Sequence, residues 1–462
     1  PKAVDHMEEQ RFAVDRGEDF VRETRGTTTC LDDCNDTHSC FHRVYKITKF
    51  LMKTNKMAYL CAEKECRSMN TEKLKLFIQG RKGLLPKIEA AVRGQKDIIW
   101  FHVPSYGEFE EARPVIEATR RRFPDRKILL TFFSPSGYIP LQHYDKVDWV
   151  FYLPLDTPWG MKRFLDIVRP AKAIFTITDF WPVMMNMLRR RKIDTYIMSV
   201  HVEPDSYHLS WWDVNYRQIM RNCYTCVMVR DQMSYDVLTK LGVPRVKITG
   251  DPRIDRVADI LKEPWSNPVV DAWCQGKKVF IAGSTFPAED KMMTDIANRH
   301  PDCKIMLIPH EPDPKEAEAI LAQARHGAVK YTDYAGKEPD ETLLGAQILV
   351  VNTVGMLARL YRYGYAALIG GGFTDNMPHS VVEPAVFGMP ITFGPVFGRE
   401  SHCRNLHAQG GAFPVNDAQE LEAFFEKCIS DKDFVEQAAR ITRDYCQRST
   451  GATENIMDTI FA

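Results

Sequence analysis

The chain has 462 residues, more than one hydrophobic core usually organises, so we expect two or three domains. Its composition is that of a soluble globular protein, with 44% hydrophobic and 26% charged residues. The 61 basic residues balance the 61 acidic ones, so no overall electrostatic field favours a nucleic acid or another polyanion as a partner.

Two further features of the composition bear on location. The 12 cysteines occur without a secretory signal, which favours reduced thiols in a cytosolic compartment. No stretch approaches the roughly 18 uninterrupted apolar residues that a membrane-spanning helix requires. The best candidate, residues 50–62, is interrupted by Lys53, Asn55 and Lys56, so we expect no spanning helix.

Residues 1–70 are charged, polar and poor in periodic apolar runs, which predicts a loosely folded, divergent extension. Cysteine and histidine are dense within it, and such side chains can bind zinc. Their spacing matches no known zinc module, so free thiols in a flexible tail remain the alternative. The residues concerned are Cys30, Cys34, His38, Cys40, His42, Cys61 and Cys66.

From residue 71 to 250 the pattern predicts a first α/β domain. A helical pattern begins at Thr71 and is interrupted by a basic turn at residues 80–83. Strands and helices then alternate, which is typical of parallel βαβ units in a doubly wound sheet. We expect strands at 98–103, 127–133, 149–153, 171–177, 194–200 and 225–230, and helices after Glu108, at 161–168, from Trp181, near 216–220 and at 234–241.

A proline-rich, mostly polar segment at 251–276 predicts an interdomain linker, after which the alternation restarts in a second domain at 277–430. The C-terminal helices at 431–462 are expected to cross back to the first domain. Two doubly wound domains predict a cleft lined by the carboxyl ends of their strands, where ligands bind. In the second domain, strands are expected at 278–282, 304–308, 347–351, 367–369 and 390–393, and helices at 289–299, 314–324, 356–363, 418–430 and 432–448.

The stretch 370–395, GGGFTDNMPHSVVEPAVFGMPITFGP, follows one of these strands and opens with three glycines. Glycines permit positive φ and close approach of a ligand to the main chain. Ser380 and Glu383 have the spacing of a capping box at a helix start. Because a helix N-terminus attracts anions, a phosphate or carboxylate is the expected guest. The alternative is a tight strand-to-helix turn with no ligand.

Other strand ends carry small polar residues. In the second domain Ser284, Thr285 and His310 follow strands, as does the segment 352–356, and together they suit a nucleotide. None resembles the Rossmann dinucleotide fingerprint or a Walker loop. In the first domain Glu108 follows the first strand, where it could act as a general base or simply favour the helix dipole. The loops at 134–137 and 178–182 could line an acceptor pocket or cap helices.

Six motifs in order resemble the 3-deoxy-D-manno-octulosonic acid (Kdo) transferases, GT-B glycosyltransferases of lipopolysaccharide biosynthesis. The resemblance runs from about Phe77 to the C-terminus, and residues 80–83 resemble the basic turn that follows the family's membrane anchor. The motifs are WxHxxSxGE at 100–108, DFWP at 179–182, AGST at 282–285, IPHEP at 308–312, NTVGM at 352–356 and the stretch 370–395.

This resemblance implies transfer of Kdo from CMP-Kdo to a lipid A precursor, with inversion, at the cytoplasmic face of the bacterial inner membrane. Glu108 would be the catalytic base, and Arg253 would offset charge on the departing phosphate, so neither a metal nor a resident cofactor is needed. Asp179, at one glutamate position of the family, would be a further catalytic residue. The donor residues implied are Ser284, Thr285, Pro309, His310, Val354, Gly355, Met356, Ser380, Val381, Val382 and Glu383, and the acceptor-side residues are Ser105, Gly107, Ser136 and Gly137.

The chain departs from the family pattern at several positions. Ile177 stands where the family has a second glutamate, Arg253 where it has lysine, and Ser380 where it has asparagine. The segment usually reading Ala-Arg-Leu-Ser is Val-His-Val-Glu at 200–203. The extension replaces the hydrophobic anchor, so peripheral contact with the membrane surface is expected. This contact would use the basic residues Lys73, Lys75, Arg81 and Lys82 with apolar neighbours.

Two other functions remain open at this point. One is a different GT-B enzyme that acts on another nucleotide sugar, such as a sugar-nucleotide epimerase. The other is a non-catalytic relative that binds a nucleotide or a lipid. Ile177 and the missing anchor support this alternative. The presence of both Glu108 and Glu383 argues for an enzyme.

Overall fold

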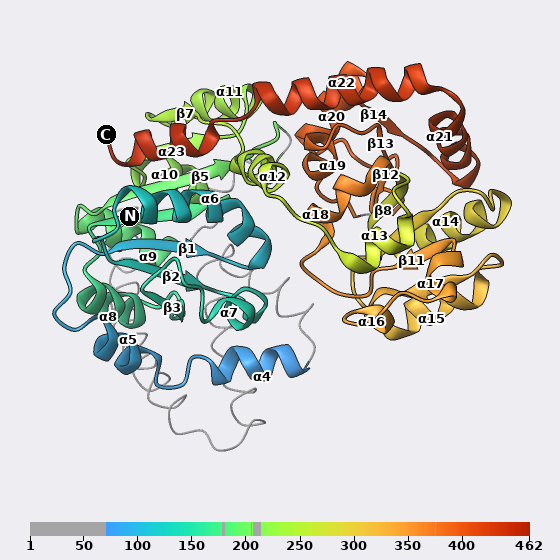
Figure 1. Cartoon of the computed structure of the whole chain (residues 1–462). Helices are drawn as coiled ribbons and strands as arrows, with labels where there is room; N and C mark the ends of the chain where they lie inside the picture. The colour runs from blue at the N-terminus through green and yellow to red at the C-terminus, as the bar shows by residue number, and fades with distance from the viewer. Residues whose placement is uncertain (1–70, 178–180, 205, 207–213, 375) are drawn as a thin grey trace, which may run out of the picture. The chain divides into compact units, whose positions relative to one another are not determined.

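The computed structural model describes residues 71–177, 181–204, 206, 214–374 and 376–462 (Figure 1). The cysteine and histidine residues at 30–66, and Asp179, lie outside the described residues. The chain divides into two compact units. Unit 1 comprises the chain up to Pro252 together with Ala452–Ala462, and unit 2 comprises Arg253–Gly451.

Unit 1 is built on a seven-stranded parallel sheet with the strand order β3-β2-β1-β4-β5-β6-β7. Its strands are β1 (Ile99–Val103), β2 (Ile128–Phe132), β3 (Trp149–Tyr152), β4 (Lys172–Thr176), β5 (Asp194–Val200), β6 (Cys226–Val229) and β7 (Val246–Ile248). Its helices are α4 (Thr71–Gln79), α5 (Leu84–Val92), α6 (Tyr106–Arg122), α7 (Pro135–Leu141), α8 (Pro158–Val168), α9 (Pro182–Arg190), α10 (Val214–Asn222), α11 (Gln232–Lys240) and α23 (Ala452–Ile460).

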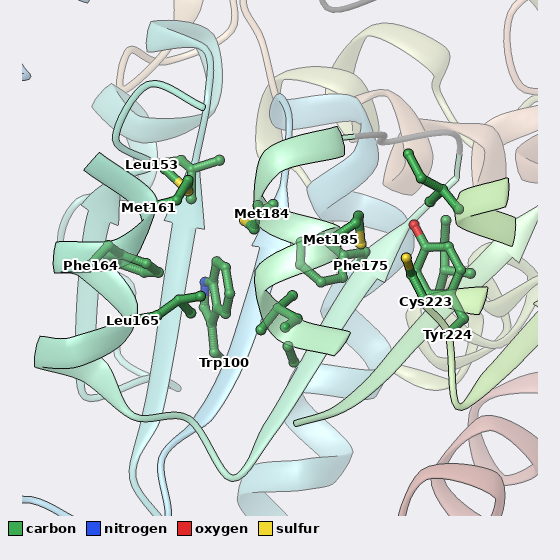
Figure 2. Close-up of a cluster of buried hydrophobic side chains, with 14 of the residues drawn as sticks. Trp100, Leu153, Met161, Phe164, Leu165, Phe175, Met184, Met185, Cys223 and Tyr224 are labelled. Carbon is green, nitrogen blue, oxygen red and sulfur yellow. The ribbon is translucent and has the colours of Figure 1, made fainter. Parts of the chain in front are cut away.

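Helices cover both faces of this sheet because alternate strand residues point to opposite sides. Trp100 packs on the face covered by α5, α8, α9 and α10, whereas Phe101 packs on the face covered by α6 and α23. Figure 2 shows the first of these cores, in which the Trp100 ring makes edge contacts with Phe164 and Phe175 at centroid distances of 4.9 and 5.4 Å. Such a doubly covered parallel sheet places all strand carboxyl ends on one edge.

The last helix, α23, completes the second face of unit 1. The Phe461 ring lies 4.7 Å from that of Phe123 at the end of α6, and the Thr119 hydroxyl lies 3.4 Å from the sulfur of Met457. The chain's final residues therefore belong to the core of unit 1, although α22 before them belongs to unit 2.

Unit 2 repeats the plan with a seven-stranded parallel sheet in the order β10-β11-β9-β8-β12-β13-β14. Its strands are β8 (Val279–Thr285), β9 (Ile305–Pro309), β10 (Ala328–Lys330), β11 (Ile348–Val350), β12 (Gly364–Ile369), β13 (Ile391–Phe393) and β14 (Ala412–Pro414). Its helices are α12 (Pro252–Lys262), α13 (Pro268–Cys274), α14 (Pro287–Arg299), α15 (Pro314–Gln323), α16 (Tyr331–Tyr334), α17 (Glu341–Gly345), α18 (Leu357–Leu360), the 3₁₀ turn η2 (Tyr361–Tyr363), α19 (Val382–Val386), α20 (Ser401–Gln409), α21 (Ala418–Ser430) and α22 (Lys432–Arg448).

The sheet of unit 2 is likewise covered on both faces. Phe280 and Leu307 pack beneath α14, α15 and α21, and Ile281 and Met306 pack beneath α13, α17 and α19. The predicted alternation of strands and helices is confirmed in both units. The sequence pattern missed short or proline-led elements such as α7, α20 and β7.

The segment 251–276, predicted as an interdomain linker, is largely helical in the structure. This segment holds α12 and α13, and Ile254, Val257 and Val270 lie in the core of unit 2. The reason is that Pro252 and Pro268 stand at helix starts, where proline is favoured because the first helical N–H has no partner within the helix.

Arg81 also differs from its predicted role as a membrane-facing cation. Its side chain is only 8% exposed, and its guanidinium donates to the carbonyl oxygens of Phe77, Phe133 and Leu153 at 3.2, 2.8 and 3.0 Å. The cation also lies over the rings of Phe77, Phe133 and Tyr152. Arg81 therefore ties the α4–α5 turn to the ends of β2 and β3. No helix among the described residues is long and apolar enough to cross a membrane.

Replacing Arg81 by methionine should destabilise unit 1 by about 2–4 kcal/mol, because three carbonyl oxygens lose a buried donor. Urea unfolding followed by circular dichroism would measure this change. Lys75→Met, at an exposed position of α4, is the matched control and should change stability by less than about 0.5 kcal/mol. Equal effects of the two variants would contradict the assigned role of Arg81.

Candidate functional site

The carboxyl edge of the unit 2 sheet brings together most of the predicted donor residues. Ser284 has a φ of +55°, and the register between β8 and β9 shifts between Gly283 and Thr285, so β8 bulges where it ends. The His310 amide donates to the Thr285 carbonyl at 2.8 Å, which joins the ends of β8 and β9. The loops that leave these two strands are therefore held side by side.

The glycine turn after β12 packs tightly against the end of β8. A Cβ atom at Gly370 would lie 2.0 Å from the carbonyl oxygen of Ser284, and Gly371 has a φ of +100°. The Gly370 amide donates to the Gly283 carbonyl at 2.9 Å. Glycine is thus required for close approach, as predicted, but at Gly370 it is the chain's own backbone that approaches and not a ligand.

The predicted capping box at Ser380 is wrong. The helix α19 begins two residues later, at Val382, with Val381 at its N-cap and no side-chain cap. The His379 amide donates to the Gly370 carbonyl at 3.0 Å, which holds the preceding segment extended along the glycine turn and delays the helix. Glu383 instead lies in the first turn of α19. Burial, and then the charge of Glu383, raise the pKa of Tyr361 well above its ordinary value, so the carboxylate lies near that phenol.

A cavity of about 580 Å³ opens beside these loops. Its lining residues come from the ends of β8, β9 and β12 and from the first turn of α15, and they include two predicted residues, Thr285 and His310. The others were not predicted. The full lining is Thr285, Phe286, Pro287, His310, Glu311, Glu316, Asn376, Met377 and His379.

Three rings cluster at this cavity. The imidazoles of His310 and His379 stack at a centroid distance of 4.4 Å, and the Phe286 ring lies 5.3 and 5.7 Å from them. Burial, and then the charge of His310, lower the pKa of His379 to about 4, so His379 is neutral near pH 7. The sequence reasoning missed His379 although it precedes Ser380, because the turn, and not a helix start, determines its position.

Two buried carboxylates lie behind the cavity. The Thr285 hydroxyl donates to Asp290 at 2.5 Å. Its proton is therefore not available to a phosphate, although the sequence suggests Thr285 as a donor-site residue. Burial, with the charges of Glu316 and Glu289, raises the pKa of Asp290 to about 7, against the effect of the Thr285 hydrogen bond. Glu289 accepts two main-chain N–H groups.

The remaining predicted donor residues occupy strand ends of the same sheet. Pro309 is buried at the end of β9. The segment after β11 projects outward, with Val354 75% exposed, Gly355 at a φ of +85° and Met356 at the N-cap of α18.

Arg253 lies in the first turn of α12, within unit 2. Burial, with the charge of Glu400, raises the pKa of Cys403 on α20, and the charges of Arg404 and Arg253 act in the opposite direction. Arg253 thus belongs to the α12–α20 region of unit 2.

In unit 1 the loops after β1 and β2 meet. The amides of Phe133 and Ser134 both donate to the Pro104 carbonyl, at 3.2 and 2.8 Å. A Cβ atom at Gly137 would lie 3.0 Å from the Ser105 carbonyl carbon, so the two loops are in contact. Three of the four predicted acceptor-side residues, Ser105, Ser136 and Gly137, therefore lie together at the carboxyl edge of this sheet.

Glu108 lies in the first turn of α6, partly exposed, and its carboxylate accepts a hydrogen bond from the Ser105 hydroxyl. Gly107 precedes it, open to the surface. The carboxylate is therefore fixed by a neighbour yet accessible, which fits a general base as well as a residue that favours the helix dipole.

The residue after β4 carries backbone strain. Ile177 has a φ of +57°, an outlier for a β-branched residue, and its amide donates to the Met198 carbonyl at 2.9 Å. Such outliers concentrate at functional sites. Ile177 directly precedes the 178–180 segment that contains the predicted Asp179.

A charged cluster that the sequence reasoning did not single out lies after β5 and β6. The Nδ1 of His201 lies 3.1 Å from Asp231, and its Nε2 lies 2.9 Å from Glu203. The hydrogen bond to Asp231 and the nearby carboxylates raise the pKa of His201 although burial opposes them. The carboxylates therefore favour the protonated form of His201, which stands at the position of the arginine in the family pattern at 200–203.

The described part of the chain contains one group of side chains close enough to share a metal ion, formed by His300, Glu422 and Glu426. Arg299 already makes two hydrogen bonds to Glu422, at 2.6 and 2.8 Å. This cluster on α14 and α21 is thus a surface ion-pair network.

Comparison with known proteins shows which family this chain resembles. Residues 78–256 match the family model described as 3-deoxy-D-manno-octulosonic-acid transferase (kdotransferase). The 3-deoxy-D-manno-octulosonic acid transferase of Haemophilus influenzae is 25% identical over 375 residues, which cover 78% of this chain and 86% of the relative. That of Aquifex aeolicus is 24% identical over 358 residues, which cover 74% of this chain and 89% of the relative. The chain is thus similar to Kdo transferases over most of its length.

The solved structures support the fold of the chain. UDP-GlcNAc 2-epimerase from Neisseria meningitidis matches 78% of this chain and 99% of its own, with a TM-score of 0.57 and 13% identity. At this identity the likeness speaks for the fold and not for an epimerase. The predicted GT-B class, two doubly wound Rossmann-like domains, is confirmed.

The His201 cluster makes stability depend on pH. Because the pKa of His201 is higher in the folded chain than its ordinary value, its stabilising contribution is present below that ordinary value and is lost as pH rises through the folded pKa. His201→Gln should therefore lower the melting temperature more at pH 5.5 than at pH 9, by a difference of about 2–4 °C. Differential scanning fluorimetry of both proteins at both pH values would measure it, and a pH-independent deficit would contradict the assigned charge.

Proposed function

We propose that this protein is an inverting glycosyltransferase that moves Kdo from CMP-Kdo to a lipid A precursor. The observation that carries the proposal is the gathering of predicted donor residues at one sheet edge in a chain that resembles this family. Thr285 and His310 line the cavity, and Glu383 follows the adjoining glycine turn. The match to the family model and to whole-length relatives supports this choice among GT-B reactions.

The donor would occupy the carboxyl edge of unit 2. The Glu383 carboxylate would accept hydrogen bonds from the ribose hydroxyls, as it lies in the first turn of α19. Pro309 and His310 would contact the cytidine part, together with the exposed segment Val354, Gly355 and Met356. Ser284, Ser380, Val381 and Val382 would complete the donor site. Thr285 would contact the donor through its main chain, since its hydroxyl is bonded to Asp290.

The acceptor hydroxyl would lose its proton to Glu108 as its oxygen attacks the anomeric carbon of Kdo. The bond from that carbon to the CMP phosphate breaks on the opposite side, which gives inversion. Arg253 would stabilise the charge that grows on the departing phosphate, with the planar geometry of a guanidinium. This mechanism calls for no resident metal or cofactor, and Asp179 would be a further catalytic residue.

We place the reaction at the cytoplasmic face of the inner membrane, with the protein bound peripherally. The exposed residues Lys75 and Leu76 of α4, the latter 37% exposed, offer a basic and apolar contact of the kind that lipid surfaces attract. Arg81 takes no part in this contact because it is buried.

The direct test is to incubate the protein with CMP-Kdo and a tetraacyl lipid A precursor and to weigh the lipid product by mass spectrometry. We expect a mass increase of one or more Kdo units. If the protein instead epimerises a UDP-sugar in a parallel incubation, the result would support an epimerase. Binding of CMP without any product would support a non-catalytic relative. Either result would contradict the proposed reaction.

Glu108→Gln should reduce the transfer rate by about 10²–10⁴-fold, because an amide cannot accept the proton, while the affinity for CMP stays unchanged. Glu110→Gln on the same helix is the matched control, since Glu110 forms a partly exposed ion pair with Arg113. Transfer rates come from the mass assay and affinities from calorimetry. Full transfer activity in Glu108→Gln would eliminate this carboxylate as the base.

A further inference from the structure

Glu289 is a buried carboxylate that joins two loops of unit 2. It lies in the first turn of α14 and is 1% exposed. Its Oε2 accepts the Phe286 N–H at 2.8 Å, and its Oε1 accepts the Gly371 N–H, also at 2.8 Å. One oxygen thus holds the loop after β8, and the other holds the glycine turn after β12.

These two loops both contribute to the cavity wall. Phe286 and Pro287 line it from the β8 side, and Asn376, Met377 and His379 line it from the β12 side. Because each Glu289 oxygen bonds one loop, the carboxylate fixes the two sets of wall residues relative to each other.

Gly371 is a junction within its own loop. Its carbonyl accepts the Gly394 N–H at 3.1 Å, and the next residue, Gly372, donates to the Asn376 carbonyl at 2.7 Å. A shift of the Gly371 amide would therefore be passed to the segment at 376–379 that carries His379. The bond from Glu289 is the side-chain contact that fixes this amide.

The chemistry of the position requires a carboxylate. Burial raises the pKa of Glu289, and the hydrogen bonds from the two main-chain N–H groups act against that rise. Only a carboxylate offers an acceptor on both oxygens, because a glutamine presents an NH₂ group to one of the two amides. An uncharged side chain would be easier to bury. The two acceptor oxygens are therefore the reason for a carboxylate at this position.

We propose that Glu289 is a positioning residue for the donor, which holds the β8 and β12 loops at the spacing that the CMP-sugar requires. This inference rests on the proposed function, and it adds a residue that touches neither the sugar nor the nucleotide. It acts through the Phe286 and Gly371 amides.

The test compares Glu289→Gln with the wild type and with Glu422→Gln, a control carboxylate in a surface ion pair of the same unit. Glu289→Gln keeps the side-chain size and one acceptor but loses the other. We expect the KM for CMP-Kdo and the Kd for CMP to rise about tenfold, while the KM for the lipid acceptor changes less than twofold. Glu422→Gln should match the wild type in all three constants.

The readouts separate positioning from general stability. Assays run well below the melting temperature of each variant, and a purely structural role would lower that temperature without changing the KM for CMP-Kdo. That result, or a fall in kcat with unchanged CMP affinity, would overturn the inference. If Glu289→Gln does not fold, Glu289→Asp replaces it, since its carboxylate is one methylene too short to reach both amides.

The failure of this inference differs from the failure of the proposed function. A wild-type protein that binds no CMP, by calorimetry or thermal shift, would overturn the proposed function and the inference with it. A wild-type protein that binds CMP, beside a Glu289→Gln variant that binds it equally well, would overturn the inference alone.

Discussion

The close contact between the main chains at the ends of β8 and β12 is the constraint on which the candidate donor site depends. Gly370 lies so near the Ser284 carbonyl that a methyl group could not be placed there. Two neighbouring parallel strands end at the same edge, and this contact keeps their loops from spreading apart. The cavity beside the loops, the ring cluster of Phe286, His310 and His379, and the start of α19 all follow from that approach.

The carboxyl edge of the unit 2 sheet brings buried acidic side chains close to a neutral imidazole. Asp290 has a pKa of about 7 and His379 a pKa of about 4, and both shifts arise mainly from burial. The carboxylates face main-chain amides and a hydroxyl, as Glu289 and Asp290 show. Main-chain N–H groups that are already bonded to buried acids cannot serve a phosphate. An anionic donor would therefore depend on side-chain cations and on the amides that remain at the loop surface.

Much of the fold could be predicted from the sequence because hydrophobic period and strand-end chemistry are local signals. The strands around Trp100 and Phe280 were located to within a few residues, and the glycine run marked the close approach after β12. The local signals gave wrong predictions where contacts with residues distant in the sequence determine the structure. Ser380 has capping spacing, yet the bond from the His379 amide to Gly370 delays the helix. Arg81 lies in a basic turn of the kind usually found at the surface, yet its buried side chain donates to three carbonyl oxygens from separate segments. His201 acquires Asp231 as a partner, and Glu289 acquires the Gly371 amide, only through the sheet order, which no short motif encodes.

The most direct test of the account is a crystal structure of the protein with CMP bound. The account predicts that the nucleotide lies at the carboxyl ends of β8, β9 and β12, with its ribose against Glu383 and the glycine turn in place beside Ser284. CMP bound elsewhere on unit 2, with Glu383 and His310 free of contact, would contradict it.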